Sequence, residues 1–175
     1  MKKLSFYPLL LLAVYIMQSC NQPAKPAHSE EEMIAAAKAV DAKFIDGMNN
    51  KNLNAIMSCY WNSAELEMFP PGEVVELKGY DAAKASFAKF IGNPMKAKHE
   101  LTETHYKVAG DNVIGWGHVT VTIEADSGAA PMVLQGRYTE VLAYKDSNMV
   151  YIIDHASIPM QEPGPPPTEA PAGKK

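Results

Sequence analysis

The chain has 175 residues, of which 47% are hydrophobic and 21% charged, and its formal net charge is −4 at pH 7. No run of Lys and Arg interrupts this acidic balance, which argues against nucleic acid as a partner. Two cysteines are too few for a disulfide-stapled scaffold or a cysteine metal cage.

The N-terminus is typical of an exported protein. A basic pair, Lys2-Lys3, precedes an apolar run to Ile16 that is too short to span a membrane as a mature helix. Residues 1–19 are therefore expected to be a signal peptide. Met17-Gln18-Ser19-Cys20 resembles the lipobox of bacterial lipoproteins, which implies that Cys20 becomes the lipidated first residue of the mature chain. Ordinary cleavage would instead leave Cys20 as a thiol.

The segments on either side of the domain are predicted not to pack. Residues 20–28 are polar and carry two prolines, which favours a semi-extended spacer. Residues 160–175 hold five prolines and no large apolar side chain after Met160, so we expect a tail without a core. Resemblance to lipoproteins of two-membrane bacteria, with no Asp after the cysteine, implies an outer-membrane anchor through lipid alone. The domain would then face the periplasm or the cell surface.

Residues 29–159 have the length of one domain with one core, and helices are predicted first. Ser29 and Glu32 form a capping box ahead of an apolar stripe, and Asn52 and Asp81 are placed to cap two further helices. The expected elements are a long helix ending at about residues 47–50, helices at 53–60 and 81–91, and short strands at 64–69 and 74–77.

From Lys98 onward the hydrophobic period changes to two, which predicts four long strands at 98–108, 112–125, 132–144 and 149–158. The short connections between them favour an antiparallel meander. The sequence therefore predicts an α+β domain in which three N-terminal helices pack one face of a curved, mostly antiparallel sheet.

Several short motifs in this order resemble the SnoaL-like and ketosteroid-isomerase-like proteins of the nuclear transport factor 2 superfamily. They are Asn62-Ser63-Ala64, the Pro-Pro-Gly turn, Gly79-Tyr80-Asp81, Gly110-Asp111-Asn112-Val113, Arg137-Tyr138-Thr139 and the closing segment from Ile153 to Pro159. The resemblance implies a cone-shaped barrel with a pocket between helices and sheet, and commonly a homodimer. Such proteins include isomerases, cyclases, dehydratases and members without catalytic activity. The fold therefore indicates where a site lies but not which reaction it catalyses.

Two basic residues are candidates for lining that pocket. If the strand face of Arg137 and the strand face of His155 are concave, the two side chains converge. Arg137 can bind a carboxylate or an enolate through paired hydrogen bonds, or it can form a structural ion pair with Asp41 or Glu67. His155 can act as a base near neutral pH or pack at the end of its strand.

Carboxylates, hydroxyls and one aromatic pair complete the candidates. Asp41 and Glu67 can project into the cavity, where burial would raise their pKa values toward those of useful bases. Trp116 and His118 share a strand face that lines either the cavity or a dimer interface. The candidate hydroxyls are those of Tyr60, Tyr80 and Tyr106. No combination of them reproduces the oxyanion pair of ketosteroid isomerase, which is a tyrosine and a protonated acid.

These patterns predict a domain that binds a small, partly apolar or acidic molecule without a cofactor. His99 and His105 are too far apart on a strand to share one metal ion, so no metal site is expected. Cys59 is expected to be a buried structural thiol. One alternative is a proton-transfer or lyase-type enzyme, and another is a non-catalytic interaction module that dimerises through the outer faces of its strands.

Overall fold

The computed structural model describes residues 28–124 and 129–159. The assigned signal peptide, Cys20 and the proline-rich tail lie outside these residues, as does nearly all of the spacer. Within the described part of the chain, no helix is long and apolar enough to cross a membrane.

Three helices come first, and two begin as the sequence predicts. Helix α2 (Glu30–Asn49) starts with the complete capping box, since Ser29 Oγ accepts from the Glu32 amide at 3.2 Å and the Ser29 amide donates to the Glu32 carboxylate at 2.8 Å. Helix α3 (Leu53–Met57) is capped by the Asn52 side chain, which accepts from an amide at 3.1 Å.

The third helix differs from its prediction at its first residue. Helix α4 (Tyr80–Ile91) begins after Gly79, which makes no side-chain cap and has a φ of +85°. Asp81 therefore lies inside the first turn, where its charge faces the positive end of the helix, instead of capping it. The left-handed backbone at Gly79 explains why glycine stands there.

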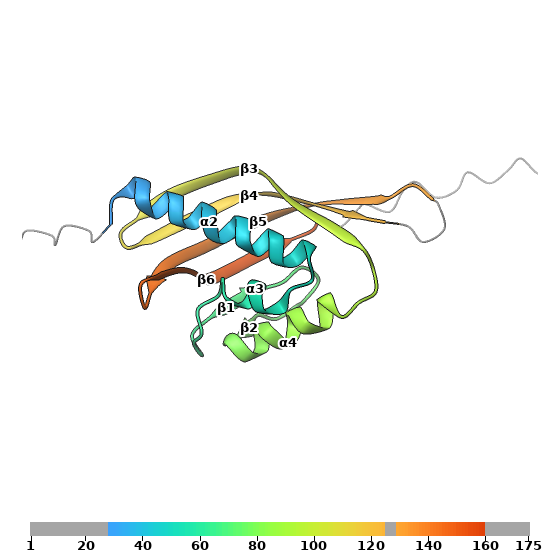
Figure 1. Ribbon diagram of the computed structural model, residues 1–175, viewed down its shortest axis with the longest axis horizontal. Coiled ribbons are helices and arrows are strands. Elements are labelled where there is room, and N and C mark those ends of the chain that lie inside the picture. The colour runs from blue at the N-terminus through green and yellow to red at the C-terminus, as the bar shows by residue number, and fades with distance from the viewer. Residues whose placement is uncertain (1–27, 125–128, 160–175) are drawn as a thin grey trace, which may run out of the picture.

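The strands form one six-stranded sheet in the order β2-β1-β6-β5-β4-β3. The four long strands are an antiparallel meander as predicted, whereas β1 pairs in parallel with β6. Their bounds are β1 Glu67–Phe69, β2 Leu77–Lys78, β3 Ala97–Ala109, β4 Asn112–Ile123, β5 Met132–Lys145 and β6 Asn148–Ser157. The sheet curves without closing, and α2 lies across its concave face beside β3 while α3 and α4 lie near β1 and β2 (Figure 1). The α+β prediction is confirmed.

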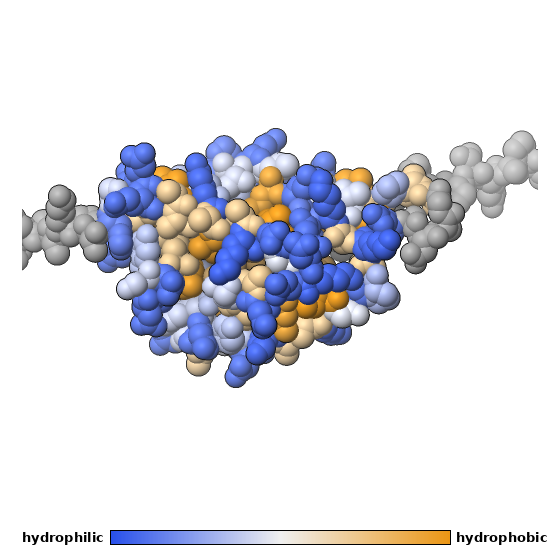
Figure 2. All heavy atoms as spheres, in the orientation of Figure 1, coloured by the Kyte–Doolittle hydropathy of each residue, from blue (hydrophilic) through white to orange (hydrophobic). Residues whose placement is uncertain are grey.

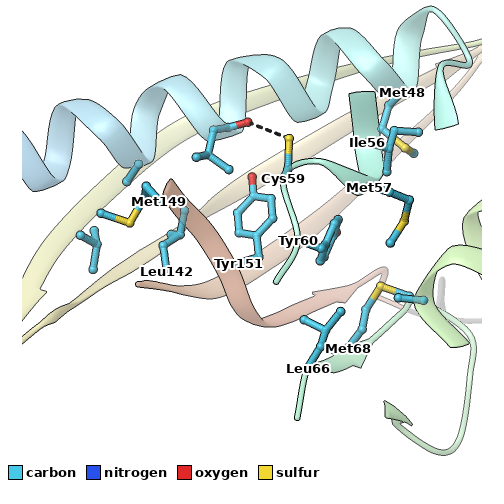
Figure 3. Packing of buried hydrophobic residues seen from close by; sticks show 14 of the residues in the cluster. Met48, Ile56, Met57, Cys59, Tyr60, Leu66, Met68, Leu142, Met149 and Tyr151 are labelled. Carbon is cyan, nitrogen blue, oxygen red and sulfur yellow. Dashed lines mark hydrogen bonds between the residues drawn. The ribbon is translucent and has the colours of Figure 1, made fainter. Parts of the chain in front are cut away.

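The hydrophobic core lies between the helices and the concave face. Its fully buried side chains come from both layers and include Ile56, Cys59, Leu66, Val113 and Leu142. Figure 3 shows Tyr60 and Tyr151 within this layer, with the Tyr151 hydroxyl directed toward α2. The thiol of Cys59 lies 3.7 Å from the backbone oxygen of Val40, and burial raises its pKa to about 11, so Cys59 is a buried structural thiol as predicted.

Two irregularities decide which side chains face the core. In β3 an extra residue is inserted between Thr102 and His105, where Glu103 has a φ of +52°. In β6 the pairing with β5 shifts so that Ile152 is left without a partner. Because a bulge reverses the alternation of side chains, residues on its two sides do not follow one simple parity.

Candidate functional site

Two carboxylic acids are buried together beneath helix α2. Asp41 of α2 is 3% exposed and Glu140 of β5 is 4% exposed. Burying carboxyl groups is costly unless they are hydrogen-bonded or protonated, so their partners define the site.

Two phenols, one from β3 and one from β6, donate hydrogen bonds to Asp41. Tyr106 of β3 donates to Asp41 Oδ2 at 2.5 Å, and Tyr151 of β6 donates to Oδ1 at 2.7 Å. Burial raises the pKa of Asp41, while the two phenol hydrogen bonds oppose that rise because they favour the ionised form. Asp41 is therefore the member of the pair best suited to carry the negative charge.

Glu140 holds a proton at neutral pH. Burial, followed by the negative charges of Asp41 and Asp154, raises its pKa to about 10. Its side chain hydrogen-bonds with Asp41, so the two carboxyls share a proton. Its Oε1 atom is buried and has no hydrogen-bond partner among the described residues.

Gly115 makes room for this carboxyl. It is the register partner of Tyr106 on one side and of Glu140 on the other. A Cβ atom at Gly115 would lie 2.9 Å from Glu140 Cγ and closer still to Oε1. The unpartnered oxygen therefore lies over β4, on the side of Glu140 that faces Tyr106 and β3.

A third carboxyl extends the cluster toward β6. Asp154 is the register partner of Glu140, and Tyr60 donates to Asp154 Oδ2 at 2.6 Å. Asp154 is half-buried, and burial of its carboxyl raises the pKa to about 6, against the effect of the Tyr60 hydrogen bond. The concave face thus carries three carboxyls and three phenols in contact with one another or side by side.

An open groove of about 340 Å³ lies between α2 and β3, with Asp41 in its lining. Tyr138 donates to Thr104 Oγ1 at 3.1 Å, which leaves the hydroxyl hydrogen of Thr104 free to donate into the groove. The lining residues are Lys38, Asp41, Ala42, Ile45, Leu101, Thr104 and Tyr106. In Figure 2, apolar surface lies among charged side chains where α2 runs beside β3. The groove therefore combines apolar walls with an acidic floor.

Of the residues singled out from the sequence, the structure brings Asp41 and Tyr60 into the cluster. Arg137, Glu67 and His155 lie on the opposite, convex face of the sheet. The expected convergence of Arg137 and His155 on the pocket is corrected, because Tyr138, Glu140 and Leu142 are the β5 residues that face α2. In β6 the bulge at Ile152 places both Tyr151 and Asp154 inward.

Trp116 and His118 also lie on the convex face. The Trp116 ring stacks on His105 with 5.5 Å between centroids, and His118 Nδ1 lies 3.0 Å from the Glu103 carboxylate. Gly117 between them is required because a Cβ atom there would come within 3.0 Å of β3 backbone at the bulge. Gly117 therefore allows the backbones of β3 and β4 to approach closely, whereas Gly115 makes room for the Glu140 carboxyl.

Sequence reasoning missed Glu140, Asp154 and Tyr138. The alternation of Tyr138, Glu140 and Leu142 was a usable signal, since two large, largely apolar side chains mark an inward face on which a carboxylate stands out. Nothing local marked Asp154, because its orientation depends on the bulge two residues earlier.

Residues 42–152 match the SnoaL-like domain family. The chain belongs to that family. Among solved structures, a proposed dehydratase of the nuclear transport factor 2-like family from Streptomyces avermitilis superposes with a TM-score of 0.67 at 14% identity, covering 75% of this chain and 99% of the other. A nuclear transport factor 2-like protein from Salmonella enterica gives 0.66 at 11% identity, with coverages of 78% and 97%.

A proposed scytalone dehydratase from Novosphingobium aromaticivorans is also similar, with a TM-score of 0.62 at 12% identity and coverages of 73% and 84%. No curated protein matches this SnoaL-like chain in sequence. At these identities the solved structures share the fold alone with it. In chemical terms, the acidic floor can accept hydrogen bonds from a ligand or move a proton between two carboxyls.

Proposed function

We propose that this SnoaL-like domain binds a small, partly apolar molecule in the groove between α2 and β3. The observation that carries the proposal is Asp41, a buried carboxyl that lines the open groove and lies beside the unpartnered Glu140 Oε1. Native proteins leave few buried polar atoms unpaired, and those few coincide with sites where a ligand or water completes the bonding. A ligand that donates a hydrogen bond would meet the Asp41 carboxyl in the lining of this groove.

The groove has the composition of a small-molecule site. Ala42, Ile45 and Leu101 give it apolar walls, while Asp41 and Thr104 give it an acceptor and a donor. Its volume of about 340 Å³ falls at the lower end of the range for ligand pockets, which favours a small molecule.

The test is a fragment screen followed by protein-detected NMR. Bound fragments should shift the amide signals of α2 and β3 around Asp41, and Asp41→Asn should weaken binding at least tenfold. Glu67→Gln is the matched control, because it neutralises a carboxylate on the convex face. Fragments that shift only convex-face signals, or that bind Asp41→Asn as well as wild type, would overturn the proposal.

A second candidate is proton-transfer catalysis, favoured by the sharing of one proton between Asp41 and Glu140. The ionised Asp41 would take a proton from carbon beside a carbonyl, leaving an enolate, and return it. Incubation with cyclohexanone in D₂O should then incorporate deuterium at the carbons beside the carbonyl. Asp41→Asn should abolish this exchange while Glu67→Gln retains it, and equal exchange by both variants would rule the candidate out.

The convex face supports a proposal about assembly. Its exposed apolar side chains include Phe69 (37%), Trp116 (39%) and Ile153 (37%), a set that a two-fold partner would cover. We propose a homodimer formed through this face. Light scattering should report twice the chain mass at micromolar concentration and a monomer for Trp116→Glu, and a wild-type monomer would remove the proposal.

A further inference from the structure

The outer edge of the sheet at β3 is long and partly open. On its far side β3 pairs with no strand of the described part of the chain. Residues of an antiparallel strand alternate, one bonding to the neighbouring strand and the next pointing its N–H and C=O away. A two-residue turn joins β3 to β4, which makes Ala109 and Asn112 a hydrogen-bonded pair. Counting back from that pair, Tyr106 and Val108 turn their N–H and C=O outward.

At the other half of this edge, the structure shows what an outward-facing residue accepts. The side chain of Asn49, the last residue of α2, donates to the His99 carbonyl at 3.0 Å and accepts from the His99 amide at 2.7 Å. These are the two hydrogen bonds that a neighbouring strand would make. Within residues 28–124 and 129–159, no other side chain hydrogen-bonds to the backbone of β3. Asn49 therefore closes the edge at His99 and leaves residues 101–108 open.

The open part of the edge runs beside the groove. Figure 1 shows α2 lying along β3, and the groove lies between them. Leu101, Thr104 and Tyr106 line it from the strand, whereas Ala42 and Ile45 line it from the helix. A strand added to β3 directs every second side chain to the concave face, where α2 lies. Those side chains would enter the groove.

The charges around the open edge favour one kind of strand. Lys38 on α2 and Lys107 on the convex face of β3 are exposed, and neither has a carboxylate within 4.0 Å among the described residues. At the closed half, Lys98 already pairs with Glu100 at 2.9 Å. Opposite charges across two strands stabilise their pairing, and like charges destabilise it. The open edge therefore favours an acidic strand and disfavours a second copy of itself, which would bring lysines together.

We propose that residues 101–108 of β3 bind an extended acidic peptide as an added strand. The backbone of the peptide would bond to Tyr106 and Val108, as Asn49 bonds to His99. This inference rests on the proposed function, because it names an extended peptide as the ligand class of the same groove.

The spacing of the groove residues sets the pattern of the peptide. Lys38 and Ala42 are one helical turn apart, about 6 Å along the axis of α2. Alternate residues of a strand are about 7 Å apart. An apolar side chain at Ala42 would therefore be followed, two residues along the peptide, by an acidic side chain at Lys38.

The experiment measures amide hydrogen exchange by NMR with a peptide of sequence TVTVTET, blocked at both ends. We expect the saturating peptide to slow exchange of the Tyr106 and Val108 amides at least tenfold. The Lys107 amide, which is bonded to β4, should be unaffected. Two N-methylated versions are the matched controls, one methylated on alternate amides and the other on the remaining amides. Only one row of amides faces β3, so one version should lose binding and the other keep it, and equal behaviour would overturn the proposal.

Charge reversal tests the position of the peptide. Lys38→Glu should weaken binding of the acidic peptide severalfold and strengthen binding of its counterpart TVTVTKT. Lys84→Glu, on an exposed position of α4, should change neither. A Lys38→Glu variant that binds both peptides as wild type does would overturn the placement of the strand beside α2.

The outcomes separate this inference from the proposed function. A peptide that shifts groove signals without slowing exchange at Tyr106 and Val108 would overturn strand addition and leave the proposed function standing. Slow exchange there that depends on protein concentration without peptide would assign the edge to a second copy, and would also overturn it. If no peptide binds, this inference fails, and the fragment screen with Asp41→Asn still decides the proposed function.

Discussion

Replacing Glu140 with glutamine should remove most of the dependence of folding stability on pH just above neutrality. The folded pKa of Glu140, about 10, is raised above its ordinary value of 4.5 chiefly by burial. The folded state therefore holds a proton that the unfolded chain has released. The stabilisation tied to that proton is complete below pH 4.5 and is lost as the pH rises toward 10.

The size of the effect follows from the one-proton difference. Stability should fall by about 1.4 kcal/mol per pH unit, or about 2 kcal/mol between about pH 7 and 8.5. Three other shifted groups contribute little in this window. Asp154, with a folded pKa of about 6, and His99, whose pKa is lowered from 6.5, titrate below it, and the thiol of Cys59 ordinarily titrates at 9.0.

The assay is urea denaturation at three pH values across that window. Wild type and the convex-face control Glu67→Gln should lose about 2 kcal/mol, whereas Glu140→Gln should stay nearly level, because glutamine keeps the shape of the protonated acid. A flat wild-type profile would refute the claim that Glu140 is a buried neutral acid. A slope that persists in Glu140→Gln would place the titrating group elsewhere.

Three further substitutions test separate parts of the description. Gly115→Ala should displace the Glu140 carboxyl and lower stability by about 1–3 kcal/mol, as measured by thermal denaturation. Tyr60→Phe should raise the pKa of Asp154 above about 6, seen in ¹³C NMR titration, and an unchanged titration would argue against the hydrogen bond. Cys20→Ala should release the protein from membranes or leave an uncleaved precursor, whereas wild-type protein found soluble with unmodified Cys20 would refute lipidation.

The sequence was sufficient for the helices and for the long strands because their signals are local. Ser29 and Asn52 carry capping chemistry within three residues of their partners, and the period of two from Lys98 onward persists across four strands. Gly79 was harder to interpret. Its role depends on a positive φ, which the sequence does not show, and Asp81 two residues later is the stronger capping residue.

The site was predicted less completely because it depends on how strands are registered against each other. Asp41 was placed correctly at the margin of a helical stripe, where the period of 3.6 is reliable. Glu140 and Asp154 meet only because β5 and β6 pair with a one-residue shift at Ile152. The inserted residue reverses the faces of β6, so parity alone turned His155 inward and left Asp154 out. In β5, which pairs regularly with β4, the face of Arg137 was taken as concave in place of the face that carries Glu140.

Because Cys59 is buried, the reactivity of its thiol reports local opening of the protein. The thiol is 1% exposed, and burial holds its pKa at about 11, so the reactive thiolate is scarce while the helices cover the sheet. A maleimide or disulfide reagent can react at an appreciable rate only when α3 separates from α2. The labelling rate therefore measures the free energy of that local opening, and a ligand that holds α2 against β3 should slow it by mass action.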